Sequence, residues 1–64
     1  MEAKKVFVLV HSNVDYIDVE VYEKKERAIE ALKELAEEYG MDVYGNSADG
    51  EDNHATVEEK ILFR

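Results

Sequence analysis

Residues 16–39 read YIDVEVYEKKERAIEALKELAEEY, and within this stretch the spacing of apolar side chains changes from about two to about 3.6 residues. Over residues 16–23, apolar residues alternate with polar or tyrosine side chains, which predicts a strand with two different faces. Over residues 24–39 the apolar side chains fall on one side of a helix; they are Ala28, Ile29, Leu32, Leu35, Ala36 and Tyr39. Gly40 follows and is suited to ending that helix in the left-handed conformation. The stretch predicts a strand followed by an amphipathic helix.

The flanking sequence supplies the other strands. Residues 5–11 (KVFVLVH) are β-branched, aromatic or aliphatic almost throughout, and they predict a strand that forms a hairpin with residues 16–23. Residues 56–64 predict a final strand, whereas residues 41–44 fit either a short strand or an ordered loop. We therefore expect a single α+β domain over residues 1–64, with one helix on an antiparallel sheet of three or four strands. The element order is ββαβ, or ββαββ if residues 41–44 form a strand.

Composition excludes several classes of function. The chain has 64 residues, 16 acidic against 8 basic side chains, and a formal net charge of −8. This charge opposes direct binding to a phosphate backbone. The chain has no cysteine for a disulfide framework, and its longest apolar run, residues 6–10, is too short to cross a membrane. We expect a cytoplasmic protein without a cofactor that binds neither nucleic acid nor membranes directly.

Three segments together resemble a family of proteins. Residues 5–11, 19–22 and 25–32 resemble a group of small uncharacterised bacterial and phage proteins. Those proteins share a hydrophobic first strand ending in histidine, a second strand ending in an aromatic residue, and a Lys-Glu-x-Ala helix start. The small serine-like cap usual before that helix is missing here, where Glu23 and Lys24 stand. The resemblance implies the strand–strand–helix–strand fold and a phage or prophage origin, and it brings no catalytic residues.

The two histidines raise the question of a metal site. If the chain between the helix and the final strand is only a loop, the final strand returns beside the first and brings His54 near His11. Two imidazoles with a carboxylate from Asp15, Glu51 or Asp52 would suit zinc with an open position, as in a small metal-dependent enzyme. The spacing of the two histidines matches no metal motif. We therefore expect no metal site, no catalytic residue and no enzymatic activity, and we keep the metal-dependent enzyme as an alternative.

The predicted helix carries a row of acidic residues on its polar side. Four glutamates follow one another at every fourth position: Glu26, Glu30, Glu34 and Glu38. Their rise of about 6 Å per step is close to the distance between neighbouring phosphates along a nucleic-acid strand. A phage-type inhibitor could use such a row to mimic nucleic acid and block a nucleic-acid-binding protein. The simpler interpretation is a solvated face that keeps the protein soluble.

The size of the chain favours self-association. A chain near 60 residues has a marginal core, and without disulfides or a metal a partner surface is the remaining source of stability. One helix covers only one face of the sheet. If the helix packs on Ile17, Val19 and Val21, the uncovered face is centred on Phe7, Leu9, Tyr16 and Tyr22, with Asp18 and Glu20 at its rim. We therefore expect a non-enzymatic interaction module that forms a homodimer, or binds a partner protein, through that face.

Overall fold

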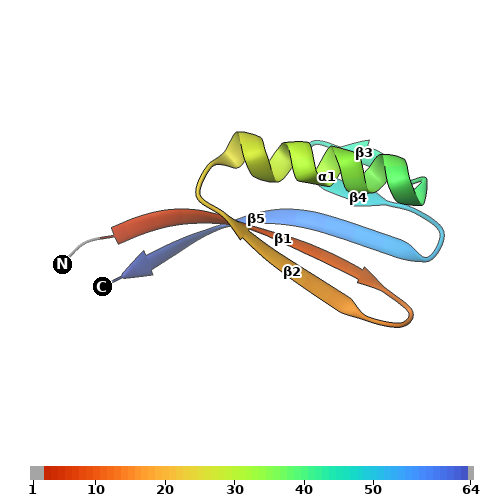
Figure 1. The fold of residues 1–64 in the computed structure, drawn as a ribbon, viewed down its shortest axis with the longest axis horizontal. Helices are drawn as coiled ribbons and strands as arrows, with labels where there is room; N and C mark the ends of the chain where they lie inside the picture. The colour runs from red at the N-terminus through yellow and green to blue at the C-terminus, as the bar shows by residue number, and fades with distance from the viewer. Residues whose placement is uncertain (1–2, 64) are drawn as a thin grey trace.

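One α-helix packs on an open five-stranded antiparallel sheet (Figure 1). The computed structural model describes the backbone of residues 3–63 and the side chains of residues 3–62. The elements follow in the order β1 (Ala3–Asn13), β2 (Ile17–Tyr22), α1 (Lys25–Tyr39), β3 (Asp42–Tyr44), β4 (Ser47–Asp49) and β5 (Asn53–Phe63). In space the strand order is β2-β1-β5-β4-β3. The α+β class and the single helix on an antiparallel sheet are confirmed, whereas three or four strands was too few.

The additional strand is β4. No strand was expected between residues 44 and 56, but Ser47–Asp49 pair with both β3 and β5. Their side chains carry no strand signal, since β4 reads Ser-Ala-Asp. Ala48 is nevertheless fully buried, because it lies opposite Ala55 of β5 beneath the helix. Tertiary packing therefore overrides local propensity in this hairpin.

The helix has the bounds that its apolar spacing predicts. It spans Lys25–Tyr39, with Lys24 as an N-cap that makes no side-chain hydrogen bond. Gly40 ends it in the left-handed region at φ 66°, and the Met41 N–H donates to the Ala36 carbonyl over 2.8 Å. Four of the buried core residues are alanines, two on the helix and two on the sheet. The buried core consists of Leu9, Ala28, Leu32, Ala36, Met41, Ala48, Ala55 and Val57.

The long strands β1 and β5 extend beyond the rest of the sheet. They pair along their whole length, from Ala3 opposite Phe63 to Asn13 opposite Asn53. β2 pairs with β1 only from Phe7 onward, so the ends of β1 and β5 project as a two-stranded arm (Figure 1). The apolar character of β1 on both faces predicts the central strand of the sheet. β1 is an interior strand, but β5 lies in the middle of the sheet.

The helix covers the opposite face of the sheet from the one we expected. Leu9 belongs to the core under the helix, with Phe7 and Tyr22 packed against it, whereas Val19 and Val21 are exposed. The expected interface was conditional on the helix packing on Ile17, Val19 and Val21, and this condition is not met, because β5 decides which face the helix covers. On one face β5 presents Ala55 and Val57, and on the other it presents polar residues including Glu58. Only the face with Ala55 and Val57 is apolar across the three neighbouring strands β1, β5 and β4.

Candidate functional site

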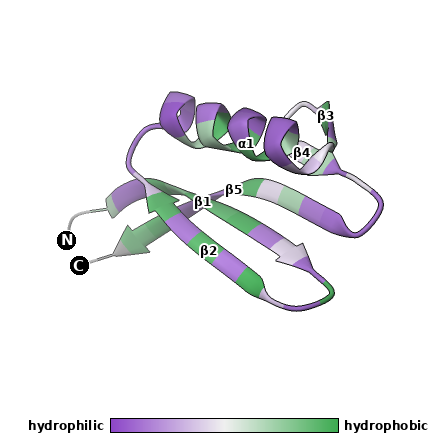
Figure 2. Cartoon of the chain, turned by 45° about the vertical axis from the view of Figure 1, so that its right-hand side comes forward, coloured by the Kyte–Doolittle hydropathy of each residue, from purple (hydrophilic) through white to green (hydrophobic). Residues whose placement is uncertain are grey.

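The uncovered face of the sheet carries a stripe of aliphatic side chains. The strand register places Val8 opposite Val21, and Val10 opposite Val19, on this face. We call the resulting surface the aliphatic stripe; it consists of Val6, Val8, Val10, Ile17, Val19 and Val21. Figure 2 shows the alternation of hydrophobic and hydrophilic residues along β2 that produces it. The three stripe residues on β2 are exposed, and exposed aliphatic residues that share one face indicate an interaction surface.

Exposure within the stripe is greatest along β2. Ile17 is 71% exposed, Val19 53% and Val21 62%, whereas Val6 is only 5% exposed. β2 is also an edge strand, so its backbone has a free side as well. All three aliphatic side chains on this six-residue strand are more than half exposed. This is unusual in a chain in which 38% of the residues are charged and could cover the surface instead. The centre of the candidate site therefore lies on β2.

The charged side chains next to the stripe are neutralised within the chain. The Lys4 ammonium lies 2.6 Å from the Glu23 carboxylate, and the Lys60 ammonium lies 4.0 Å from that of Glu58. Glu23 is exposed, and its pKa lies below the ordinary value, chiefly because its carboxylate accepts a hydrogen bond from Lys4. These pairs flank the stripe without placing an unpaired charge inside it. Each pair joins one positive and one negative charge, so the surface beside the stripe carries less net charge than the chain as a whole.

The residues that we expected at the interface lie elsewhere. Leu9 is 4% exposed beneath the helix, so it cannot contact a partner at the open face. Phe7 and Tyr22 are partly buried on the same helix-covered side. Tyr16 is exposed, but its hydroxyl lies 3.3 Å from that of Tyr39 at the end of the helix. The signal that would have identified the stripe is the alternation of Ala55 and Val57 with polar residues in β5.

Asp18 and Glu20 also lie on the helix-covered side. Their positions in the register pair them with His11 and Leu9, both of which are buried under the helix. The Tyr22 hydroxyl donates a short hydrogen bond to the Glu20 carboxylate, which is the main reason that the pKa of Tyr22 rises to about 12. We expected these two carboxylates at the rim of the open face, or paired across the strands with Lys5, Lys60 or Arg64, the last of which lies outside the described residues. Their true position leaves the stripe free of acidic residues from β2.

The two histidines lie on opposite faces of the sheet and do not form a joint site. β5 does return beside β1, but His11 pairs with Ala55, so the neighbouring His54 points the other way. The His11 ring is 4% exposed, and its Nε2 lies 3.0 Å from the Asn53 Oδ1. The His54 Nδ1 lies 3.5 Å from an Asp49 carboxylate oxygen on the open face. Among residues 3–62, no group of three histidine, aspartate or glutamate side chains could hold a metal ion.

The buried histidine has a structural role at the end of the helix. Its ring lies edge-on to Tyr16, with centroids 5.7 Å apart, and is tilted against Tyr39 at 4.9 Å. Together with the contact between the two tyrosine hydroxyls, this cluster attaches the β1–β2 turn to the last turn of α1. The pKa of Tyr39 is raised, chiefly because its hydroxyl shares this hydrogen bond with Tyr16. The cluster stabilises the fold and contains no arrangement typical of a catalytic site.

The acidic row on the helix is exposed along its whole length. The four residues Glu26, Glu30, Glu34 and Glu38 are all exposed. Glu30 and Glu34 line a hollow of about 210 Å³ together with Tyr22, Arg27 and Ala31. Glu34 also contributes to raising the pKa of Tyr22 through its negative charge. The row therefore lies on the helix, across the sheet from the aliphatic stripe, and Glu30 and Glu34 come near Tyr22 of β2.

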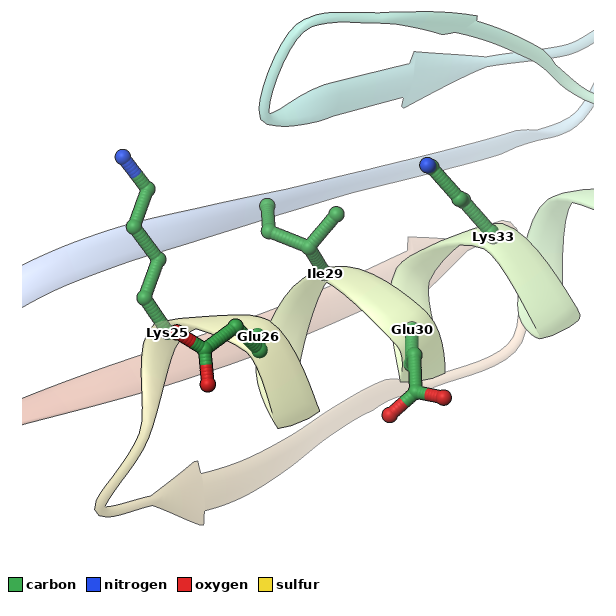
Figure 3. A pocket seen from close by; sticks show the side chains of 5 residues that line it. All are labelled: Lys25, Glu26, Ile29, Glu30 and Lys33. Atoms are coloured by element: carbon green, nitrogen blue, oxygen red, sulfur yellow. The ribbon is translucent and has the colours of Figure 1, made fainter.

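A second hollow lies on the other flank of the helix. It has a volume of about 380 Å³ and is lined by Lys25, Glu26, Ile29, Glu30 and Lys33. Figure 3 shows Lys25, Ile29 and Lys33 extending to one side of the helix, and Glu26 and Glu30 to the other. Its lining comes from a single helix, and no buried polar group in it could orient a ligand. We interpret it as a crevice between helix side chains.

The comparisons with known proteins do not add to these observations. Comparison of the chain with family models, curated proteins and solved structures finds no match. Within the described residues, no helix is long and apolar enough to cross a membrane. The resemblance to small bacterial and phage proteins stays an expectation from the sequence. Any function must therefore be argued from the surfaces of the chain itself.

Proposed function

We propose that this protein is a non-enzymatic interaction module that associates with a second copy of itself through the aliphatic stripe. The observation that carries the proposal is the exposure of Ile17, Val19 and Val21 on the uncovered face. In this arrangement the two open faces pack as a sheet sandwich, with the helices on the outside. Because the site is self-complementary, a two-fold axis would place the stripe of one copy on that of the other.

The area required for such a dimer is modest. A specific interface buries about 1,000 Å² or more in total, which is about 500 Å² from each copy. That is roughly a tenth of the 4791 Å² surface of the chain. One face of a two-layer domain can supply this area. In this chain, the part of the open face that β1 and β2 form is aliphatic. The partly exposed Val8 and Val10 would extend the buried surface beyond β2.

The distribution of charge supports packing of the two faces. Two packed sheets lie about 10 Å apart, and each helix lies on the far side of its own sheet. The acidic rows of the two copies are therefore separated by both sheets, which is well over the Debye length of about 10 Å at roughly 0.1 M salt. The remaining repulsion between two chains of charge −8 predicts that association strengthens as salt is added.

Substitution of Val19 tests this proposal. An aspartate at position 19 would be buried without a partner in each copy, so we expect Val19→Asp to weaken association about 100-fold or more. Val19→Lys should do the same, although it lowers the negative charge of the chain. Asp18→Asn lies on the helix-covered side and should leave association unchanged or slightly stronger. Sedimentation equilibrium at micromolar concentration measures all three variants beside the unmodified chain.

The same measurement distinguishes repulsion from burial. If Val19→Lys strengthens association while Val19→Asp weakens it, the contact responds to net charge and does not bury position 19. A monomer of 7.4 kDa for the unmodified chain in both low and high salt would refute the proposal.

The acidic row supports a second, different proposal: a nucleic-acid mimic that blocks a partner protein. Its supporting observation is that the four glutamates are exposed and lie away from the stripe. The double variant Glu30→Lys/Glu34→Lys separates the two proposals. It should abolish binding to a partner that recognises the row, and it should leave the dimer intact.

A further inference from the structure

Beyond the β3–β4 hairpin, one edge of β5 has no neighbouring strand among the described residues 3–63. β4 pairs with β5 only from His54 to Thr56, and the last contact is at Val57. The Val57 N–H donates to the Asn46 carbonyl over 2.8 Å, and the Asn46 amide donates to the Val57 carbonyl over 2.9 Å. Beyond Val57, β5 continues to Phe63 with β1 on one side and no described strand on the other.

The backbone groups on this edge follow from the alternation of the ladder. Since both polar groups of Val57 point away from β1, those of Glu59 and Ile61 point the same way. The groups of Lys60, between them, point toward β1. The edge therefore presents N–H and C=O groups in the spacing that an added antiparallel strand requires. Its side chains are also exposed, since Ile61 is 52% and Leu62 46% exposed.

We propose that two copies of this chain pair antiparallel along this edge, with Ile61 of each copy at the two-fold axis. The pairing joins the two arms into one four-stranded ribbon, β1-β5 of one copy followed by β5-β1 of the other. It uses none of the residues of the aliphatic stripe. It is therefore a second, independent contact between copies.

The charges along β5 select the register. A two-fold axis at Glu59 would place two carboxylates opposite each other, and an axis at Lys60 would place two ammonium groups opposite each other. An axis at Leu62 would leave only three paired positions within the described strand. With the axis at Ile61, Lys60 lies opposite Leu62, and Glu59 lies opposite Phe63. This register joins five positions and places no like charges directly opposite each other.

The surroundings of the edge are compatible with a second copy. The arm carries Lys4, Lys5 and Lys60 against Glu58 and Glu59, so it lacks the negative charge of the rest of the chain. The β3–β4 hairpin ends beside Val57, so the space next to residues 59–63 is free of described strands. An isolated two-stranded ribbon is marginally stable in water, and pairing of the arms doubles its strands. Because few residues take part, we expect a weak contact.

Single cysteines test the register directly, because the chain has no cysteine of its own. The test is made in the Val19→Asp background, which removes the contact through the stripe. Residues at the two-fold axis lie about 5.5 Å apart between Cα atoms, within the range that a disulfide spans. We therefore expect Ile61→Cys to form a disulfide dimer about tenfold faster than Lys60→Cys or Leu62→Cys alone, because only position 61 faces itself. A mixture of Lys60→Cys and Leu62→Cys should crosslink as a heterodimer.

Amide exchange in the chain without a cysteine gives an independent measurement. Protection of the Glu59 and Ile61 amides should rise with protein concentration, whereas the Lys60 amide, bonded to β1, should be protected at every concentration. Faster crosslinking at Glu59→Cys than at Ile61→Cys would overturn the register. Equal rates at positions 60, 61 and 62, or exchange at Ile61 that does not depend on concentration, would overturn the pairing itself.

Discussion

Leu32 is the side chain on which the packing of the helix depends most. It is the largest fully buried side chain, with 0% exposure, and it lies at the centre of the apolar side of α1. Leu32→Ala removes buried methyl groups and leaves a cavity, which costs about 2–5 kcal/mol. A chain of 64 residues has a total stability of roughly 3–10 kcal/mol, so this single change consumes a large part of it.

The matched control is Leu35→Ala, on the same helix but only partly buried. We expect it to cost about half as much or less, because part of its side chain already contacts water. Urea unfolding followed by circular dichroism at one fixed protein concentration measures both variants. With a slope of about 1 kcal/mol per molar for a small domain, a loss of about 3 kcal/mol lowers the midpoint by about 3 M. Equal midpoints for the two variants would refute the assignment of Leu32 to the centre of the core.

Two further predictions concern the helix end and a tyrosine. Gly40→Ala should lower the free energy of unfolding by about 1 kcal/mol in the same urea assay, because an L-residue is strained at φ 66°. The effect comes from the backbone alone, since a Cβ at this position would meet no atom within 4 Å. An unchanged midpoint would contradict the left-handed cap. Tyr22 should ionise near pH 12 in an ultraviolet titration, and Glu20→Gln should bring its pKa back toward 10. The hydrogen bond from Tyr22 to Glu20 stabilises the fold while Tyr22 is protonated. Because the pKa of Tyr22 is higher in the folded than in the unfolded chain, this stabilisation is complete below about pH 10 and is lost as the pH rises toward 12. A Tyr22 that titrates near 10 in the unmodified chain would contradict the hydrogen bond to Glu20.

The sequence predicts the strongly periodic elements and not the weakly patterned ones. The apolar spacing from Ala28 to Tyr39 and the position of Gly40 suffice to place the helix to within a residue. The β1–β2 hairpin is equally predictable, since it rests on β-branched and aromatic residues. The return of the final strand beside the first was expected only if the segment after the helix formed a loop, and it occurs although that segment forms β3 and β4. Ser47–Asp49 lacks such residues, and its strand exists only because Ala48 packs beneath the helix.

The condition that the helix packs on Ile17, Val19 and Val21 is not met, and the reason is physical. In β2 the aliphatic side chains are more apolar than Asp18 and Glu20, so this strand alone favours burial of Val19 and Val21. A helix lies across several strands, however, and the face that it covers depends on the total apolar surface that β1, β5 and β4 present on that face. The candidate site is therefore visible in the sequence only when the alternation of β5 is compared with that of β2.

Intermolecular contacts between methyl groups test self-association through the aliphatic stripe most directly. In a sample that mixes isotope-labelled and unlabelled chains, an isotope-filtered nuclear Overhauser experiment detects only contacts between copies. The proposal predicts such contacts among the methyl groups of Ile17, Val19 and Val21, and none from the buried Leu32. Contacts that involve only other surfaces, or no intermolecular contact at the concentration where the chain sediments as a dimer, would contradict it.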